Sequence, residues 1–321
     1  GATAGSEPAG RDRTLAAPAT RRLAREAGVD LDDVPTDETR DGEPFVTPEQ
    51  VSQYAEAQRA AQAADVEAVS AEATGGDGAE APETETTAEG EVERVPYRGI
   101  RRTIGQAMER SMYTAPHVSH HDTAVVDDLV EVRAELKPHA EERGTRLTYM
   151  PLVVKAVVAA LRQHPILNSQ LDEENEEILV KHYHNVGIAV ATDAGLMVPV
   201  VKNAGEKDVL TVGAEVNELA ARARDRSITR EEMQGGTFSI TNFGAIGGEY
   251  ATPIINYPET AILGLGELKQ RPVVEEGDVV ARYTLPLSLT IDHRVVDGAD
   301  AAAFANTLIE YLENPDLLLL E

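Results

Sequence analysis

Apolar positions recur with two different spacings along most of the chain after residue 94. Spacing of three or four residues predicts helices at 98–112, 127–143, 151–163, 209–223 and 299–312. Short apolar runs predict strands at 117–126, 186–190, 196–201, 237–241, 261–265 and 279–291. Asp193-Ala194-Gly195 is a turn signal between two of these strands and predicts a hairpin. Hairpins mixed with crossover helices predict an α+β sandwich with a mixed β-sheet rather than a doubly wound fold.

A second, smaller helical pattern lies between residues 13 and 56. A helix is predicted at 19–27, where Pro18 stands at its start and Gly28 is placed to end it. Residues 47–50, Thr-Pro-Glu-Gln, have the composition of a helix start, with an N-cap Thr, Pro at the first helical position and Gln at the third. So short a segment can bury only a small core. We therefore expect an all-α, two-helix docking module rather than a catalyst.

Acidic residues dominate the stretch that joins these two parts. Residues 60–93 carry ten acidic side chains and no basic one, and they contain no aromatic residue. Mutual repulsion and too little apolar surface predict an extended, flexible linker. The predicted organisation is a disordered start (1–12), a binding domain (13–56), a flexible acidic linker (57–93) and a catalytic domain (94–321).

Composition narrows the class of protein further. Cysteine is absent, which excludes disulfides and a thiolate nucleophile and fits a cytoplasmic location. The formal charge of −27 disfavours nucleic acid and anionic membranes as partners, and no apolar run reaches the length of a membrane span. Many carboxylates with few lysines suit a salt-rich cytoplasm, so we predict a halophilic source.

Two short motifs carry candidate chemistry. His293 lies between a predicted strand and the last predicted helix, in the motif Asp-His-Arg-Val-Val-Asp-Gly at 292–298. From its position alone, this histidine is either a catalytic group or a structural one. The second motif is the glycine-rich stretch 235–248, in which a strand breaks at Thr241. Its glycines would allow the backbone to approach a ligand closely. The alternative interpretation is an ordinary glycine-rich turn without a ligand.

The histidine motif resembles the signature His-x-x-x-Asp-Gly of the dihydrolipoamide acyltransferases and, more distantly, that of chloramphenicol acetyltransferase. The resemblance continues in order at 116–117, 149–151, 165–168, 185–189, 195–202, 258–264 and 313–315. It implies a catalytic domain like that of chloramphenicol acetyltransferase. It also implies acyl transfer between dihydrolipoamide and coenzyme A in a 2-oxo acid dehydrogenase complex, with pyruvate and branched-chain types favoured over the succinyl type.

The resemblance assigns roles to three residues. His293 is the general base that takes a thiol proton, and a thiol pKa of about 8.5 lies close enough to an imidazole pKa of about 6.5 for transfer near neutrality. Thr241, where many relatives carry Ser, stabilises the tetrahedral oxyanion. Asp297 holds the local structure of the motif, by pairing with an arginine or otherwise.

Coenzyme A is the substrate implied by the same resemblance. Arg98 and Arg101 are candidates for contacts with its phosphates, although an ordinary solvated arginine cluster has the same sequence pattern. Asn242 and Gly244 in the glycine-rich turn are further candidates for coenzyme binding. The lipoyl group would be carried on a domain that is absent from this chain, since no lipoyl-domain motif occurs in it.

Family members form trimers in which the histidine of one subunit faces the hydroxyl residue of its neighbour, and the trimers build larger cores. Residues 17–30 resemble the peripheral-subunit-binding domain of the same enzymes. That domain binds dihydrolipoamide dehydrogenase or the 2-oxo acid decarboxylase component. Arg21 and Arg22 would make its charge-paired contacts, with solvated arginines as the alternative. The loop 35–44 departs from the family because it is longer and acidic.

Two rival interpretations remain at this point. A catalytically silent scaffold that only recruits partners tends to lose the active-site histidine, which this chain keeps. A free-standing acyltransferase of the chloramphenicol type needs neither the small domain nor the linker. Five of the other histidines form two groups, His117, His120 and His121 in one and His182 and His184 in the other. Their spacing is compatible with a metal, but no metal is required by the family, and we interpret them as strand-surface residues.

Overall fold

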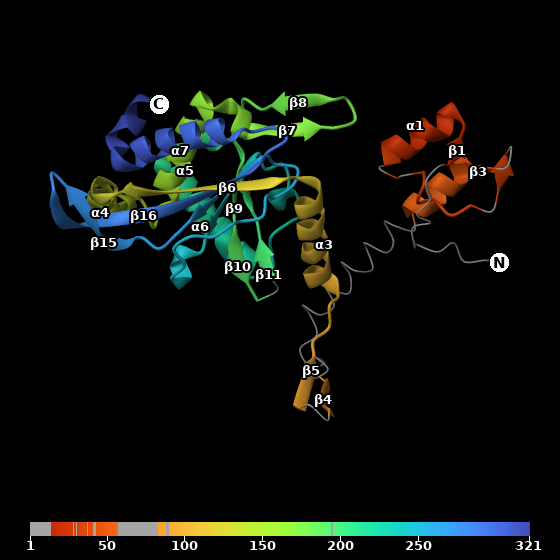
Figure 1. Ribbon diagram of the computed structural model, residues 1–321, viewed down its shortest axis with the longest axis horizontal. Helices are drawn as coiled ribbons and strands as arrows, with labels where there is room; N and C mark the ends of the chain where they lie inside the picture. The colour runs from red at the N-terminus through yellow and green to blue at the C-terminus, as the bar shows by residue number, and fades with distance from the viewer. Residues whose placement is uncertain are drawn as a thin grey trace. The chain divides into compact units, whose positions relative to one another are not determined.

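The computed structural model describes residues 14–27, 29, 31–36, 38–40, 43–56, 83–87, 90–193 and 195–321. The chain divides into two compact units, Gly1–Gly99 and Ile100–Glu321 (Figure 1). The predicted start at 1–12 and the linker residues 57–82 lie outside the described residues. None of the helices in the described part of the chain is long and apolar enough to cross a bilayer.

Two helices form the small domain, as predicted. Helix α1 is Pro18–Ala27, and residues 48–56 form the second helix. The predicted capping box at the start of this second helix is confirmed. The backbone N–H of Thr47 donates to Oε1 of Gln50 at 2.9 Å, and the N–H of Gln50 donates to Oγ1 of Thr47 at 3.4 Å. The core of the domain consists of a few small and medium apolar side chains, among them Ala24, Val34, Val46, Val51 and Tyr54.

The small domain also contains a sheet that was not predicted. Strands β1 (Leu15–Ala16), β2 (Thr39–Arg40) and β3 (Glu43–Val46) pair in the order β1-β3-β2. An all-α domain is therefore an incomplete description. The strands are two to four residues long, too short for period-two patterning to mark them in a sequence. Gly28, predicted to end α1, lies outside the described residues.

Part of the predicted flexible linker is a β-hairpin instead. Strand β4 (Glu83–Thr87) pairs antiparallel with β5 (Gly90–Arg94), with Glu83 opposite Arg94. The prediction of an extended linker up to residue 93 is wrong for these residues. It rested on charge and on the absence of aromatics, whereas backbone hydrogen bonds and the strand preference of threonine favour local pairing.

The second unit is built on one mixed sheet, so the predicted α+β class is confirmed. Its strands follow the order β12-β9-β13-β14-β16-β15. The first half of β16 pairs with β15, and its second half pairs with both β14 and β6. The neighbours β9, β13 and β14 run parallel, whereas β12, β16 and β6 pair antiparallel. The bounds of these strands are β6 His117–Val125, β9 Val186–Ile188, β12 Val200–Val201, β13 Phe238–Asn242, β14 Ala261–Leu265, β15 Lys269–Glu275 and β16 Asp278–Asp292.

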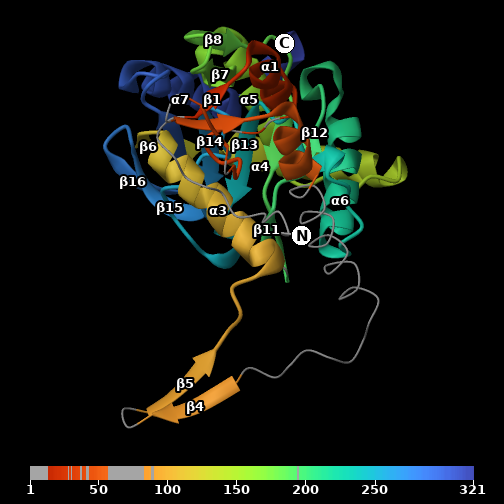
Figure 2. The ribbon, with the colours of Figure 1, turned by 90° about the vertical axis from the view of Figure 1, so that its right-hand side faces the viewer.

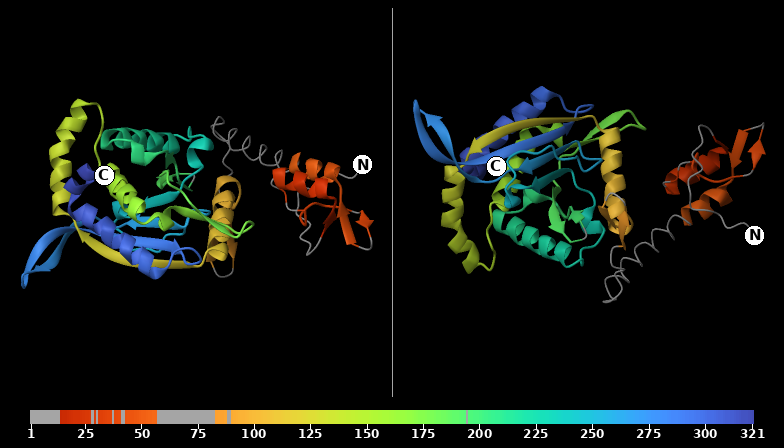
Figure 3. Two further views of the ribbon diagram at one scale, coloured as in Figure 1. Left: turned by 90° about the horizontal axis from the view of Figure 1, so that it is seen from above. Right: turned by 60° about the horizontal axis from the view of Figure 1, so that its bottom comes forward.

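One face of this sheet is covered by α4 Asp127–Glu142, α5 Met150–Gln163, α6 Val209–Arg224 and α7 Gly298–Glu313 (Figures 1 and 2). Helix α3 (Gly99–Thr114) stands at one end of the sheet instead. All five were predicted to within three residues at either end. Helix α5 packs against α6 and α7, which explains why its sequence is apolar on nearly every side. Figure 3 shows these helices beside the sheet from two further directions.

The sheet has one apolar and one polar face. Along β16, Leu285, Leu287, Leu289 and Ile291 are buried in the core under the helices. The alternate residues 288, 290 and 292 are Ser, Thr and Asp, and they are buried too. Because successive side chains of a strand point to opposite faces, the polar set lies on the face away from the core. Buried polar side chains require partners, so this second face is where candidate chemistry is expected.

Several shorter elements were not predicted. Strands β7 (Ser169–Asp172) and β8 (Glu177–Val180) form a hairpin, and β15 is an edge strand with Pro272 inside it. Acidic residues and an internal proline weaken the strand signal in sequence, and edge positions tolerate both. The predicted hairpin around residue 194 is confirmed by β10 (Val190–Thr192) pairing with β11 (Gly195–Met197). Short 3₁₀ turns occur at Pro165–Asn168, Ala204–Glu206, Glu231–Met233, Gly244–Ile246 and Pro315–Leu320.

Candidate active site

His293 lies directly after the last residue of β16, in the tight turn that leads into α7. Its backbone N–H donates to the carbonyl of Pro116 at 2.9 Å, which ties the turn to the start of β6. The imidazole is 41% exposed, and its Nδ1 lies 3.9 Å from Oδ1 of Asp297. Among the described residues this histidine is the ion-pair partner of Asp297, and no arginine reaches that carboxylate. The exposed ring is available to a ligand.

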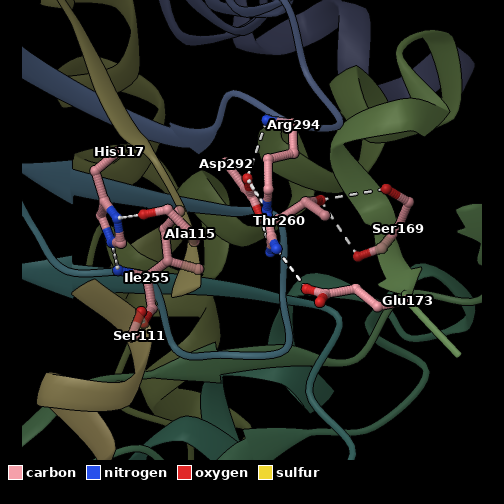
Figure 4. Close-up of polar contacts among 9 residues, drawn as sticks. All are labelled: Ser111, Ala115, His117, Ser169, Glu173, Ile255, Thr260, Asp292 and Arg294. Atoms are coloured by element: carbon pink, nitrogen blue, oxygen red, sulfur yellow. Dashed lines mark hydrogen bonds and ion pairs between the residues drawn. The ribbon is translucent and has the colours of Figure 1, made fainter. Parts of the chain in front are cut away.

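The two residues that flank His293 form a buried ion pair (Figure 4). The guanidinium of Arg294 donates from Nε and Nη2 to the carboxylate of Asp292, at 3.0 and 2.7 Å for the shorter contacts. Nη1 of the same arginine pairs with Glu173 at the end of the β7–β8 hairpin. These two acidic partners raise the pKa of Arg294, and the leading cause is the hydrogen bonds that Arg294 donates to Asp292. The network fixes the turn on both sides of the histidine.

His117 is a positioning residue that the sequence analysis assigned to the strand surface. It lies opposite Asp292 in the pairing of β6 with β16. The backbone N–H of Ile255 donates to its Nε2 at 3.0 Å, so the ring hydrogen is on Nδ1, which donates to the carbonyl of Ala115 at 2.6 Å. Ser111 on α3 donates to the carbonyl of Ile255 at 2.6 Å (Figure 4). The segment around residue 255 is thereby fastened across the polar face beside the His293 turn.

Thr241 lies near the end of β13, where the strand turns into the glycine-rich segment. Its side chain is partly exposed, and its hydroxyl has no hydrogen-bond partner within the part of the chain that the structure describes. The following turn is closed by the carbonyl oxygen of the Asn242 side chain, which accepts from the N–H of Ala245 at 3.2 Å. Gly244 packs directly on the backbone of Gly266, and any Cβ there would overlap it. The result is a rigid turn with a free hydroxyl at its start.

Within one chain the structure does not bring Thr241 to His293. Thr241 pairs with Gly264 on β14, and Gly264 pairs with Ser288 on β16. Ser288 precedes His293 by five residues, so the two candidate groups are separated by roughly 16 Å in the direction of the strands, and they also lie on strands that are two places apart in the sheet. They mark opposite ends of the polar face. A reaction that needs both groups at one acyl carbon therefore needs a second copy of the chain.

Helix α3 extends between these two ends. Gly195 in the β10–β11 hairpin packs against Ile104 near the beginning of the helix, at the sheet end where β13 finishes. Pro116, just after the helix, contacts the His293 turn. Arg101 is exposed on the first turns of α3 and therefore lies on the Thr241 side. Arg98 precedes the helix by one residue and is also exposed.

The other histidines are less uniform than predicted. His121 contacts Oγ of Ser288 at 3.0 Å and the ring of Tyr250, and it is exposed. His184 is only 9% exposed, so its assignment to the surface is wrong. Burial lowers its pKa, and the charges of Arg162, His182 and Lys155 lower it further. Among the described residues no group of three or more His, Asp or Glu side chains is placed to hold a metal.

Fold and sequence motifs now define the class of protein. Residues 89–320 match the family of 2-oxoacid dehydrogenases acyltransferase (catalytic domain), and residues 14–38 match the e3 binding domain. The first match covers well over half of the chain. The chain therefore belongs to the 2-oxoacid dehydrogenase acyltransferase family.

Particular relatives place it more narrowly. The chain is 42% identical over 310 residues to the dihydrolipoyllysine-residue acetyltransferase component of pyruvate dehydrogenase complex from Staphylococcus epidermidis, covering 95% of this chain and 70% of that protein. The solved dihydrolipoamide acetyltransferase of Azotobacter vinelandii is 37% identical with a TM-score of 0.71, over 74% of this chain and 98% of that one. A truncated catalytic core of the 2-oxoacid dehydrogenase multienzyme complex from Thermoplasma acidophilum is 36% identical, with a TM-score of 0.64 over 70% and 100% of the two chains.

Proposed function

We propose that this chain transfers an acyl group between dihydrolipoamide and coenzyme A as the core component of a 2-oxo acid dehydrogenase complex. The observation that carries the proposal is the free hydroxyl of Thr241 and the exposed imidazole of His293 at opposite ends of one polar sheet face. Acetyl is the favoured acyl group, because relatives more than 40% identical are named acetyltransferase components of pyruvate dehydrogenase complex.

Residue spacing supports the assignment of His293 and Thr241. The Azotobacter vinelandii enzyme was studied for the roles of a serine, a histidine and an asparagine in its catalytic mechanism. In that protein the serine precedes the histidine by 52 residues, and the asparagine follows it by four. Here 293 − 241 is also 52, and Asp297 follows His293 by four. Threonine keeps the hydroxyl of the serine, and aspartate adds a negative charge where the relative has a neutral amide.

The proposed mechanism uses two groups of this chain. His293 removes the proton of a thiol, and the resulting thiolate attacks the carbonyl of the acyl thioester. Negative charge then develops on the carbonyl oxygen, and the hydroxyl of Thr241 donates a hydrogen bond to it. Asp297 and the Asp292–Arg294 pair hold the histidine in place. Collapse of the intermediate expels the second thiolate, which recovers the proton from His293.

Separation of the two groups supports a site shared between subunits. We propose that His293 of one subunit faces Thr241 of its neighbour in a homotrimer, and that trimers assemble into a larger core. A relative that is 37% identical with a TM-score of 0.71 forms the cubic core of the pyruvate dehydrogenase multienzyme complex. Contacts that repeat head to tail close into a ring when the rotation between copies allows it.

Transfer assays test the activity and name the acyl group. Acetyl-, isobutyryl- and succinyl-coenzyme A are offered with free dihydrolipoamide to the wild type and to His293→Ala. The proposal predicts preference for the acetyl donor and loss of nearly all activity in the variant, while light scattering shows an unchanged assembly. An intact wild-type assembly without activity would favour the silent scaffold instead.

A mixing experiment tests the shared site. His293→Ala and Thr241→Ala are each expected to be almost inactive. When both are unfolded and refolded together, a subunit with an intact histidine meets a neighbour with an intact hydroxyl at about one quarter of the interfaces. Activity is therefore expected to rise toward that fraction of the wild-type value. Complementation that never exceeds the sum of the two variants would overturn the shared site.

We further propose that the small domain binds dihydrolipoamide dehydrogenase, the decarboxylase component, or both. Its match to the e3 binding domain supports the first partner. Arg21 and Arg22 on α1 are both exposed, as a charged docking surface requires. The same acidic, cysteine-free composition supports a salt-rich cytoplasm as the environment of the complex.

A further inference from the structure

A small cavity of about 130 Å³ lies away from the proposed active site. It is found where the last turn of α5 meets the segment before β9 and the 3₁₀ turn Ala204–Glu206. Strands β13 and β14 stand between β9 and the β16 strand that leads to His293, which places the cavity roughly 14 Å or more from that turn. Its lining is mostly polar and consists of Arg162, His182, Tyr183, His184, Asn203, Gly205 and Glu206.

Two nitrogen-bearing side chains converge at this cavity. Nη2 of Arg162 donates to the carbonyl of Gly205 at 3.1 Å. A Cβ on Gly205 would stand 3.2 Å from Nη2 of Arg162 and 3.3 Å from Nδ1 of His184. Both nitrogens therefore lie close to the Cα of Gly205, and a Cβ there would also stand 3.3 Å from Cγ1 of Val158, so a larger residue would crowd this wall of the cavity. The other guanidinium nitrogens of Arg162 have no partner among the described residues.

The charge around the cavity is unusual for this chain. Although the chain has a net charge of −27, no carboxylate within its described part lies within ion-pair distance of Arg162, Lys155, His182 or His184. Of the described residues that line the cavity, Glu206 alone carries a carboxylate, and it lies beyond ion-pair distance of these nitrogens. Four of the six lysines of the sequence fall between residues 155 and 207. Nζ of Lys155 donates a hydrogen bond to a neutral group, the backbone carbonyl of Lys207, at 2.9 Å.

His184 shows the effect of this local field. It is more than nine-tenths buried, and its ring makes no hydrogen bond to any other described residue. Burial lowers its pKa first, and the positive charges of Arg162, His182 and Lys155 lower it further. Burial, and then the charge of Arg162, lowers the pKa of Lys155 as well, against a smaller opposing effect of the carboxylate of Asp208. The positive charges of these side chains repel one another in a partly buried site. A bound anion would reduce this repulsion and stabilise their charged forms.

We infer that this cavity is a binding site for an oxyanion of the size of phosphate, held by Arg162 with His184 and His182. A planar guanidinium with free N–H groups is suited to two oxygens of such an ion. Each neutral imidazole supplies one further N–H donor to the same cavity. Gly205 lines the cavity beside both groups, and any side chain there would press on Arg162 and His184.

Phosphate binding is the direct test, measured by calorimetry on the full chain at constant ionic strength with KCl as the balancing salt. Arg162→Gln is expected to raise the Kd for inorganic phosphate about tenfold or more, because it removes a charge-assisted hydrogen bond. Gly205→Ala, which narrows the cavity without changing charge, is expected to weaken binding too. Arg224→Gln is the matched control, since Arg224 is an exposed arginine in the last turn of a different helix.

A second measurement locates the ion on the wild-type protein. Crystals soaked in selenate are expected to give an anomalous peak between Arg162 and His184. Absence of that peak, or a phosphate Kd in Arg162→Gln within twofold of the control, would overturn the site. Coenzyme A and dephospho-coenzyme A identify the source of the anion. Displacement of phosphate by coenzyme A alone assigns the site to its 3′-phosphate, and displacement by neither assigns it to a free oxyanion.

Discussion

Asp292 and Arg294 are joined by four hydrogen bonds across the histidine that stands between them. One comes from the backbone N–H of Arg294 and three from its guanidinium, and all are between 2.7 and 3.2 Å long. Asp292 is only 2% exposed, so its buried negative charge has to be compensated by the positive charge of Arg294. The two residues beside His293 therefore close the turn, and contacts with Pro116 and Glu173 tie it to the rest of the unit.

Loss of the arginine is expected to weaken the fold strongly. Arg294→Gln leaves a buried carboxylate without its cation, which costs roughly 3–5 kcal/mol in the free energy of unfolding. Glu173→Gln is the matched control, because it removes the 54% exposed acid on the other side of the same arginine and is expected to cost under about 1 kcal/mol. Urea denaturation measures both values. Equal losses in the two variants would contradict the central role of Asp292.

Two replacements of Thr241 distinguish the contribution of its hydroxyl to catalysis from the contribution of its volume. Thr241→Val keeps the volume and removes the donor, so kcat is expected to fall about 10²–10³-fold, the usual effect of one oxyanion-hole donor. Thr241→Ser keeps the donor and is expected to stay close to the wild-type rate. The measurement is steady-state acyl transfer with the KM for coenzyme A recorded alongside. A Val variant as active as the Ser variant would remove Thr241 from the mechanism.

Glu259 is expected to make stability depend on pH. Complete burial raises its pKa from 4.5 to about 7, against the opposing effects of the side chains of Ser239 and Asn256 and of the charge of Lys181. The folded state thus holds its proton more tightly than the unfolded state. The stabilisation is fully present below pH 4.5 and is lost as the pH rises through about 7, by roughly 3 kcal/mol in total.

Glu259→Gln isolates that contribution. The variant has no proton to lose, so its free energy of unfolding is expected to fall less between pH 5 and pH 8 than that of the wild type. The quantity to compare is the difference between the two proteins at each pH, since other groups contribute equally to both. A constant difference across this range would show that Glu259 keeps an ordinary pKa.

The small domain offers a test of partner binding. Exchange of both Arg21 and Arg22 for Ala is expected to raise the Kd for dihydrolipoamide dehydrogenase about tenfold or more, since charge-assisted hydrogen bonds to acidic groups are lost. Arg25→Ala, another exposed arginine on α1, is the control and is expected to bind normally. Surface plasmon resonance with the immobilised dehydrogenase measures all three proteins. Equal affinity in all of them would assign both arginines to the solvated surface.

Salt is expected to stabilise the whole chain. At a net charge of −27, repulsion between carboxylates opposes the compact state, and the Debye length falls from about 10 Å at 0.1 M to about 3 Å at 1 M salt. The free energy of unfolding is therefore expected to increase between low and molar KCl. Sorbitol at equal osmolality controls for effects other than screening. Full stability at low salt would count against a salt-rich origin.

Periodicity was sufficient to predict most of the catalytic unit. Helix α5 and strand β14 were predicted almost to the residue, because α5 is buried over most of its length and β14 over all of it, and their composition reflects that burial. The strands of the small domain and the hairpin at 83–94 were not predicted. Whether a segment of a few residues forms a strand depends on the strand that pairs with it, and the sequence of the segment alone does not reveal that partner.

The histidines show that sequence patterns also identify only part of the site. His293 stood out because a motif surrounds it in the sequence. His117 did not, since its importance comes from Ile255, which is 138 residues away in the chain and 3.0 Å away in space. His184 was taken for a surface residue, and its burial depends on how α5 packs against the segment before β9.

The sequence by itself determined the fold class, the identity of the candidate groups and the spacing that links them to a family. Local patterns of burial and short motifs record these properties directly. Only the tertiary structure decided that Thr241 and His293 lie at opposite ends of one sheet face, that Arg294 pairs with its own neighbour, and that Arg162 meets His184 at a cavity. Distances between residues remote in the chain depend on strand order and register, which are set by packing and hydrogen bonds across the whole domain.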